Sequence, residues 1–286
     1  MYKRQGPEIE VISRQIANAH TVFNITMTLI WVCLIKLMVK IVMTLIPDGK
    51  KGVEDPGSPI YLDENIISQP AAALQLVAKE IFRMSDQVRD ILKKTIELVK
   101  NEEVKSIDGL KENGEQVERL GKCITEYLAA LFSSGSLTEQ QAAQTASLMC
   151  VLSDVERMGT LSVEMAECML ERSDRKYKYT PEAMDELQKS LKVLNKMFCD
   201  SLKALQGDDG IEPGKMMKRK DKLLDLDIKM RKAHIERVNK GKCKASLTAP
   251  FTNILHLIDR MGNSCINLAD VAESGTSMKY FMLEEK

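Results

Sequence analysis

The stretches DVERMGT and LIDRMGN place an acidic residue directly before Arg-Met-Gly at two points far apart in the chain. The acid is Glu156 in the first copy and Asp259 in the second. Both copies lie inside long helical patterns, so each acid belongs to a defined face of a helix. A carboxylate in such a place can contribute to binding a hard cation, or it can pair with a basic neighbour. The choice between these roles depends on whether the surrounding helices repeat as well.

The helical pattern does repeat. From Pro70 onward, apolar residues recur at intervals of three and four, which predicts amphipathic helices. We expect six of them, over 70–101, 107–132, 138–172, 181–206, 214–239 and 249–273. The third and the sixth contain the two copies of the motif. We therefore predict an all-α domain over 70–286, built from two three-helix repeats at about 70–173 and 174–278.

Composition excludes several classes of protein. The 286 residues carry 41 basic and 41 acidic side chains, so no net charge favours nucleic acid as a partner. The seven cysteines form no C-x-x-C pair, which argues against a zinc site and against a disulfide framework. No phosphate-binding loop, nucleophile elbow or zinc-protease motif is present, and we expect no enzyme activity.

The segment 16–35 contains no charged side chain over about 20 residues, a length that matches the core of a bilayer. We predict a membrane-spanning helix here, with Lys36 and Lys40 at its exit and an interfacial extension that continues to Ile46. Residues 1–47 together are predicted to form the membrane segment. The alternatives are a buried core helix and a signal peptide. Residues 48–69 are predicted to be a linker, because they are rich in turn-forming residues.

Four polar residues lie within this apolar segment. Polar side chains at membrane depth usually face other helices or a transport pathway, so we expect this face to contact further membrane helices. The residues are Asn18, His20, Thr21 and Asn24. Positive charge after the segment predicts an inner-membrane protein whose helical domain is cytosolic.

Three longer stretches of the sequence resemble a known domain family. HIERVNKGKC at 234–243, NILHLIDRMGNSCINLADV at 253–271 and DVERMGTLSVEMAE at 154–167 resemble the PhoU domain. With the apolar segment NAHTVFNITMTLIWVCL before them, the order of elements is similar to the C-terminal part of bacterial sodium/phosphate cotransporters of the NptA type. That resemblance implies transporter helices upstream of residue 1, which would carry sodium and phosphate, and a chain that is a C-terminal piece.

The resemblance also implies a metal site. The PhoU motif usually has a second carboxylate one turn after the first, and two carboxylates at that spacing can converge on a hard cation. Here the second position is Thr160 in one repeat and Asn263 in the other, so each repeat keeps one motif carboxylate. We expect divalent metal to bind weakly at most, and otherwise the acids to pair with basic neighbours while Met-Gly serves close helix packing. The candidate ligands are Glu156, Thr160, Glu164, Asp259, Asn263 and Asp270.

The histidines of the helical domain, His234 and His256, have no carboxylate or nucleophile at a spacing typical of acid-base chemistry. We expect both to be structural.

Two functions fit these observations. The first is a fragment of a sodium-dependent phosphate transporter, in which a membrane helix carries a cytosolic PhoU-like regulatory domain. The alternative is a membrane-anchored PhoU-like adaptor that binds phosphate-signalling proteins, with metal as a further ligand left open.

Overall fold

The computed structural model describes residues 7–45, 55–100, 106–173, 178–207 and 214–273. Within these ranges the chain forms seven α-helices and two short 3-10 helices, and no β-strand. The prediction of an all-α fold is confirmed. The chain divides into two compact units, residues 1–54 and residues 55–286, which are described separately below.

The first unit contains one long helix, α1 (Pro7–Leu45). Hydroxyl groups within it are satisfied locally, since Thr21 Oγ1 donates to Ala17 O at 3.0 Å and Thr28 Oγ1 donates to Asn24 O at 2.8 Å. The prediction of a helix over 16–35 is confirmed, and the helix extends beyond that segment at both ends.

The prediction that this helix spans a membrane is not supported. Among the residues that the structure describes, no helix is both long enough and apolar enough to cross a bilayer. In α1 the apolar residues are interrupted by Asn18, His20 and Asn24. The end of the predicted interfacial extension, at residues 46–47, lies outside the described ranges.

The second unit is a bundle of six helices. Their bounds agree with the predicted ones within one residue: α2 (Pro70–Lys100), α3 (Asp108–Ser133), α4 (Glu139–Ser173), α5 (Pro181–Leu205), α6 (Lys215–Asn239) and α7 (Thr248–Glu273).

Side chains at the helix starts explain this agreement. Thr138 and Gln141 form a reciprocal capping box before α4, in which Thr138 Oγ1 accepts from Gln141 N and Gln141 Oε1 accepts from Thr138 N. Thr180 accepts from Ala183 N at the start of α5. The residue before α6 is Gly214, which has a φ of 82°, a backbone conformation that only glycine adopts readily.

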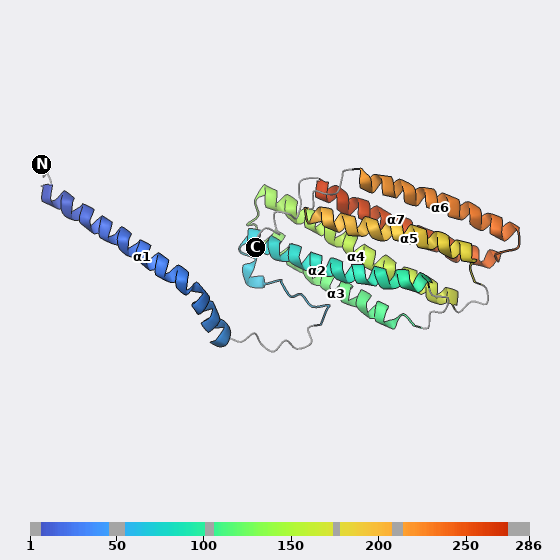
Figure 1. The fold of residues 1–286 in the computed structure, drawn as a ribbon, viewed down its shortest axis with the longest axis horizontal. Coiled ribbons are helices and arrows are strands. Elements are labelled where there is room, and N and C mark those ends of the chain that lie inside the picture. Colours follow the sequence, from blue (N-terminus) through green and yellow to red (C-terminus); the bar gives the residue numbers. More distant parts are fainter. Residues whose placement is uncertain (1–6, 46–54, 101–105, 174–177, 208–213, 274–286) are drawn as a thin grey trace. The chain divides into compact units, whose positions relative to one another are not determined.

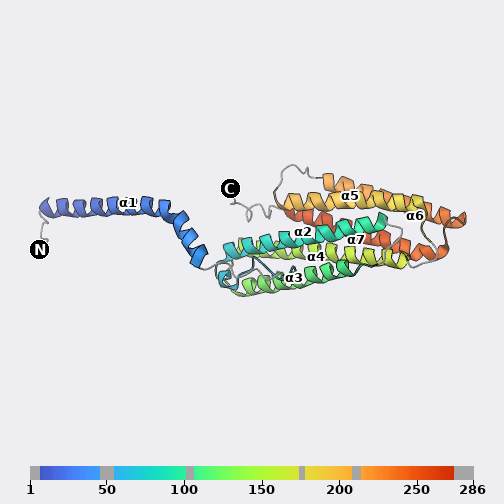
Figure 2. The same ribbon diagram turned by 60° about the horizontal axis from the view of Figure 1, so that its bottom comes forward.

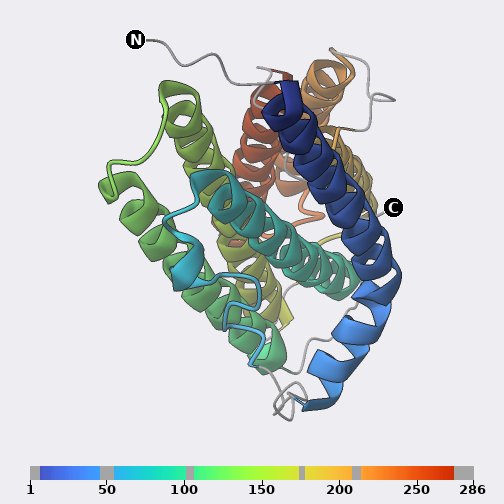
Figure 3. The same cartoon turned by 90° about the vertical axis from the view of Figure 1, so that its left-hand side faces the viewer.

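The helices pack as two sets of three. In one set α2, α3 and α4 contact each other, and in the other α5, α6 and α7 do so. Contacts of α4 with α7 and of α2 with α5 join the sets, which lie side by side in the end-on view (Figure 3) and run along a common direction (Figure 2). Buried side chains from all six helices form one continuous core. The division into two repeats at about 70–173 and 174–278 stays a prediction.

Residues 48–69 were predicted to be a linker, but part of this segment is bonded to the helical bundle. Residues 48–54 are outside the described ranges, but residues 55–61 form a strap that is bonded to the bundle. The fully buried Glu80 on α2 accepts from the backbone N–H groups of Ile60 and Tyr61, at 2.9 and 2.7 Å. Arg83 donates to the carbonyls of Pro56 and Ser58. These charged anchors, rather than apolar burial, fix the strap, so hydropathy gave no signal for it.

Candidate functional site

The glycine of each Arg-Met-Gly element marks a close approach between helices. A Cβ atom at Gly159 on α4 would lie 3.3 Å from Val88 Cγ2 and 3.4 Å from Val117 Cγ1. A Cβ atom at Gly262 on α7 would lie 3.2 Å from Leu223 Cδ1 on α6. The methionines before both glycines are fully buried. The motif therefore packs α4 against both α2 and α3 in the first set, and α7 against α6 in the second.

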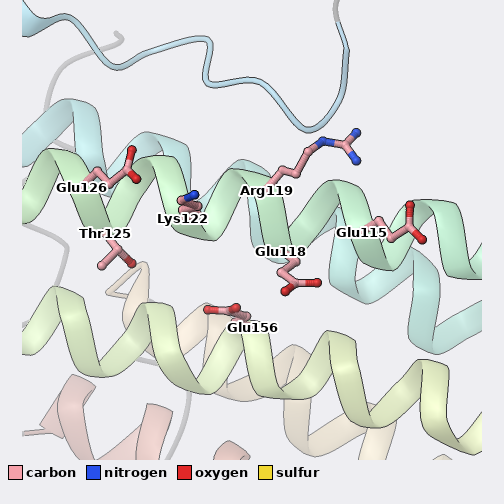
Figure 4. Close-up of a pocket in the computed structure, with 7 residues that line it drawn as sticks. All are labelled: Glu115, Glu118, Arg119, Lys122, Thr125, Glu126 and Glu156. Carbon is pink, nitrogen blue, oxygen red and sulfur yellow. The ribbon is translucent and has the colours of Figure 1, made fainter.

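This packing places the motif acid at the seam between the third and the middle helix. In the first set Glu156 Oε2 would lie 3.2 Å from a Cβ atom at Gly121 on α3. The absence of a side chain at Gly121 leaves the space that the Glu156 carboxylate fills. Figure 4 shows Glu118 from α3 and Glu156 from α4 pointing toward one another, while Arg119 points away from them.

A shallow pocket of about 710 Å³ surrounds these two acids, and we call it the α3–α4 pocket. Its lining consists of Glu115, Glu118, Arg119, Lys122, Thr125, Glu126 and Glu156. Arg119 is bonded to Asp55 of the strap, Nη2 to Oδ1 at 3.3 Å, so its charge is drawn away from the acids. Within the described residues Glu156 forms no ion pair.

The surroundings of Glu156 disfavour the charged form of its carboxylate. Partial burial raises the pKa of Glu156, and the nearby Glu118 carboxylate raises it further. A basic group brought into the α3–α4 pocket would therefore gain from an acid that has no counter-ion in the described part of the chain.

In the second set the corresponding acid is already paired. Lys220 on α6 donates to Asp259 Oδ1 at 2.5 Å and to the Asp259 carbonyl at 3.0 Å. The Lys220 side chain is 17% exposed, and its ammonium would lie 3.3 Å from a Cβ atom at Gly262. A basic side chain of the chain itself thus occupies the space beside the second motif acid.

The other predicted ligands do not gather around these acids. Thr160 is exposed and donates to the Glu156 carbonyl at 3.2 Å. Glu164 pairs with Arg260 at 3.8 Å, across the two sets. Asn263 and Asp270 are exposed on α7.

These residues do not fit the metal that the family resemblance implies. In the described part of the chain, no group of three or more His, Cys, Asp or Glu side chains converges in a way that could hold an ion. The first set offers two neighbouring carboxylates, and the second offers one that is neutralised by Lys220. Weak metal binding stays a prediction.

The histidines also differ in environment. His234 is buried, its ring stacks on Phe251 with centroids 4.6 Å apart, and its Nε2 lies 3.1 Å from Thr248 Oγ1. Burial lowers the pKa of His234, with a smaller contribution from the Arg237 charge. His256 is exposed. The contacts of His234 are those of a packing residue.

The four polar residues predicted to face other membrane helices lie exposed along α1, and Thr21 bonds within its own helix. The residues are Asn18, His20, Thr21 and Asn24.

Comparison with known proteins shows a similarity to PhoU proteins. Residues 81–169, which run from α2 through α3 to α4, match the PhoU domain. The phosphate-specific transport system accessory protein PhoU homolog 1 of Thermotoga maritima is 24% identical over 209 residues, covering 72% of this chain and 88% of that protein. The chain is PhoU-like. The match to the PhoU domain contains Glu118, Glu156 and the α3–α4 pocket.

Sequence reasoning missed three charged residues of this PhoU-like chain. Glu118, Arg119 and Lys220 lie on the middle helices, where charged side chains at helical spacing are usually solvated. A signal existed in Gly121 and Gly159, since glycine in a helix interior is unfavourable by about 1 kcal/mol and often marks a close approach.

Proposed function

We propose that the PhoU-like chain is an adaptor that regulates phosphate transport by binding partner proteins, without catalysing a reaction itself. The observation that carries this proposal is the PhoU match over α2–α4, the part of the bundle that holds the α3–α4 pocket. The Thermotoga maritima relative is named as an accessory protein of a phosphate-specific transport system, which suggests the same context for this chain.

The contact we propose is the α3–α4 pocket. Its carboxylates Glu118 and Glu156 lie close together and are not neutralised by a basic residue in the described part of the chain. A Lys or Arg side chain of a partner would relieve the repulsion between them. The second set lacks this property, because Lys220 already neutralises Asp259. We therefore propose that the two repeats differ in their roles and that the first repeat recognises the partner.

The reading as a sodium-coupled transporter piece is less well supported than the adaptor. The comparisons match the bundle to PhoU and to an accessory protein, and no helix in the described ranges meets the requirements of a membrane span. The inner-membrane location and the upstream helices stay predictions.

The test uses cells in which the gene for this chain is deleted. Phosphate uptake would be measured at low and high external phosphate, with and without the restored chain. We expect deletion to abolish the dependence of uptake on external phosphate, and the native chain to restore it. The double variant Glu118→Gln/Glu156→Gln should restore it poorly, because its pocket has lost both charges.

The matched control is Asp86→Asn/Asp90→Asn, which removes two exposed acids from α2. It should restore regulation fully. An unchanged uptake profile in the deletion strain would contradict the proposed function, and full restoration by the pocket variant would contradict the assignment of the pocket.

A further inference from the structure

Helix α6 carries an apolar stripe that the rest of the bundle leaves exposed. The helix lies at the edge of the bundle, where its main contacts are with α5 and α7 (Figure 1). Its inner face is buried, whereas the stripe is exposed along about 27 Å at 1.5 Å per residue. A solvated helix face does not need four large apolar side chains in line. The members of the stripe are Met217, Leu224, Ile228 and Ile235, each between 48 and 57% exposed.

The same helix carries an excess of positive charge. Residues 215–239 contain nine basic and four acidic side chains, so the helix has a net charge of +5 in a chain whose own net charge is zero. Four exposed lysines of α6 form no ion pair in the described part of the chain. At 3.6 residues per turn they lie beside the stripe, on the side opposite to the buried face. These lysines are Lys215, Lys218, Lys222 and Lys232.

The other charged side chains of α6 are mostly bonded within the chain. Arg219 donates to Asp200 on α5. Arg237 donates to Glu186 on the same helix at 3.1 Å. Among the acids of α6, Asp221 alone has no ion pair within the described ranges. The arginines therefore hold α6 on the bundle, and the four lysines carry the charge that α6 presents outward.

An apolar stripe bordered by lysines is typical of a helix that lies on an anionic membrane surface. The apolar side chains enter the boundary of the acyl chains, and the long lysine side chains reach the lipid phosphates. A protein partner matches this surface less well, because lysine is depleted in protein interfaces. Nucleic acid also matches it less well, because the stripe has no aromatic ring on which a base could stack.

We propose that α6 binds the surface of a membrane that contains anionic lipids. The apolar stripe faces the lipid, and the helix axis lies parallel to the surface. This contact involves one leaflet and does not require a helix that crosses the bilayer. The inference does not depend on the proposed function, since it uses neither the PhoU match nor the α3–α4 pocket.

A single tryptophan on the stripe of the full chain tests the proposal. Trp31 on α1 is the one native tryptophan, so Trp31→Phe gives a background in which Ile228→Trp is the sole probe. The probe reports the surroundings of α6 whether or not α1 also binds lipid. Vesicles of phosphatidylglycerol and phosphatidylcholine should move its emission to shorter wavelength. Vesicles of phosphatidylcholine alone should leave the emission unchanged, and added salt should reduce the shift.

The matched control for the probe is Phe132→Trp in the same background. Phe132 is an apolar residue on α3 that is 56% exposed and lies outside the stripe. The emission from this position should not respond to either kind of vesicle, because α3 has no place in the proposed contact. Circular dichroism would confirm that the variants keep the native helix content.

The lysines are tested with the probe at position 228. Lys218→Gln/Lys222→Gln removes two of the four charges, and the partition coefficient for anionic vesicles should fall about 30-fold. The matched control is Lys93→Gln/Lys94→Gln, which removes two exposed lysines from α2. It should leave the partition coefficient nearly unchanged, since these lysines lie on another helix.

Three results would overturn the proposal. These are an emission at position 228 that anionic vesicles leave unchanged, an equal shift with phosphatidylcholine alone, and a partition coefficient that Lys218→Gln/Lys222→Gln does not lower. The first result would leave the stripe as a contact for a helix of another protein.

Discussion

Lys220 Nζ lies 2.5 Å from Asp259 Oδ1, so the second motif acid has a basic partner on the neighbouring helix. Glu156, the first motif acid, lies beside Glu118 instead. The two sets of three helices therefore differ in the charge beside the motif acid, and two of the predictions below use that difference.

Replacing Lys220 with Met keeps the length of the side chain and removes its charge. The free energy of unfolding should fall by about 1 kcal/mol, because two hydrogen bonds to Asp259 are lost while the partly exposed pair is screened by solvent. Urea unfolding measures this change. The control is Lys189→Met, which breaks an exposed pair with Asp185 and should change the free energy very little. Equal effects of both substitutions would contradict the special role of Lys220.

Replacing Glu156 with Gln should stabilise the chain at pH 7, by about 0.5 kcal/mol at most. The pKa of Glu156 is raised in the folded state, so the folded chain binds this proton more tightly than the unfolded chain does. The stability that protonated Glu156 contributes is fully present below the unfolded pKa, and it is lost as the pH rises through the raised folded pKa. The advantage of the variant should therefore disappear in acid. Unfolding curves at several pH values check this expectation, with Glu115→Gln on the exposed rim of the pocket as control.

His234 should make the bundle less stable in mild acid. Its pKa is lowered in the folded state, so between that value and the ordinary value near 6.5 the unfolded chain binds more protons than the folded chain. The stability that neutral, buried His234 contributes is fully present above the unfolded pKa. It is lost as the pH falls through the lowered folded pKa. His234→Gln should flatten the dependence of stability on pH in that range, as measured by thermal melts. The exposed His256 provides the control variant His256→Gln. If that control flattens the curve equally, the assignment to His234 is wrong.

The two motif glycines should respond differently to alanine. At Gly159 the new methyl group would press on Val88 and Val117, which are buried and stiff, so we expect a net loss of about 1 kcal/mol. At Gly262 it would meet the ends of Leu223 and Lys220, which can move aside. The helix preference for alanine, about 1 kcal/mol, should then dominate and leave that variant as stable as the native chain or more so. Melting temperatures test this: we expect a lower value for Gly159→Ala, and a value equal to or above that of the native chain for Gly262→Ala.

The strap should open when Glu80 is replaced by Ala. Glu80 is fully buried and accepts from Ile60 N, Tyr61 N and Arg83 Nε. Its loss leaves these donors without an acceptor, which should lower the free energy of unfolding by about 3 kcal/mol. Limited proteolysis should then cut within residues 55–61 faster than in the native chain, where hydrogen bonds to Glu80 and Arg83 hold the segment. Arg119→Gln, which removes only the exposed bond to Asp55, should have a much smaller effect.

The sequence by itself determined the helices of the bundle. Apolar residues at intervals of three and four fixed each helix, and local caps such as Thr180 fixed the ends, because both signals act within a few residues of the chain. The repeated Arg-Met-Gly element likewise predicts a tandem arrangement, since a packing motif recurs with the unit that needs it.

Only the tertiary structure decided how the charged residues are paired. Lys220 and Asp259 are separated by 39 positions, and Glu80 holds a strap that hydropathy assigns to a linker. An exposed lysine and a lysine that neutralises a motif acid look alike in sequence. Their difference arises from which helices lie side by side, and this depends on packing over the whole core and not on any local pattern.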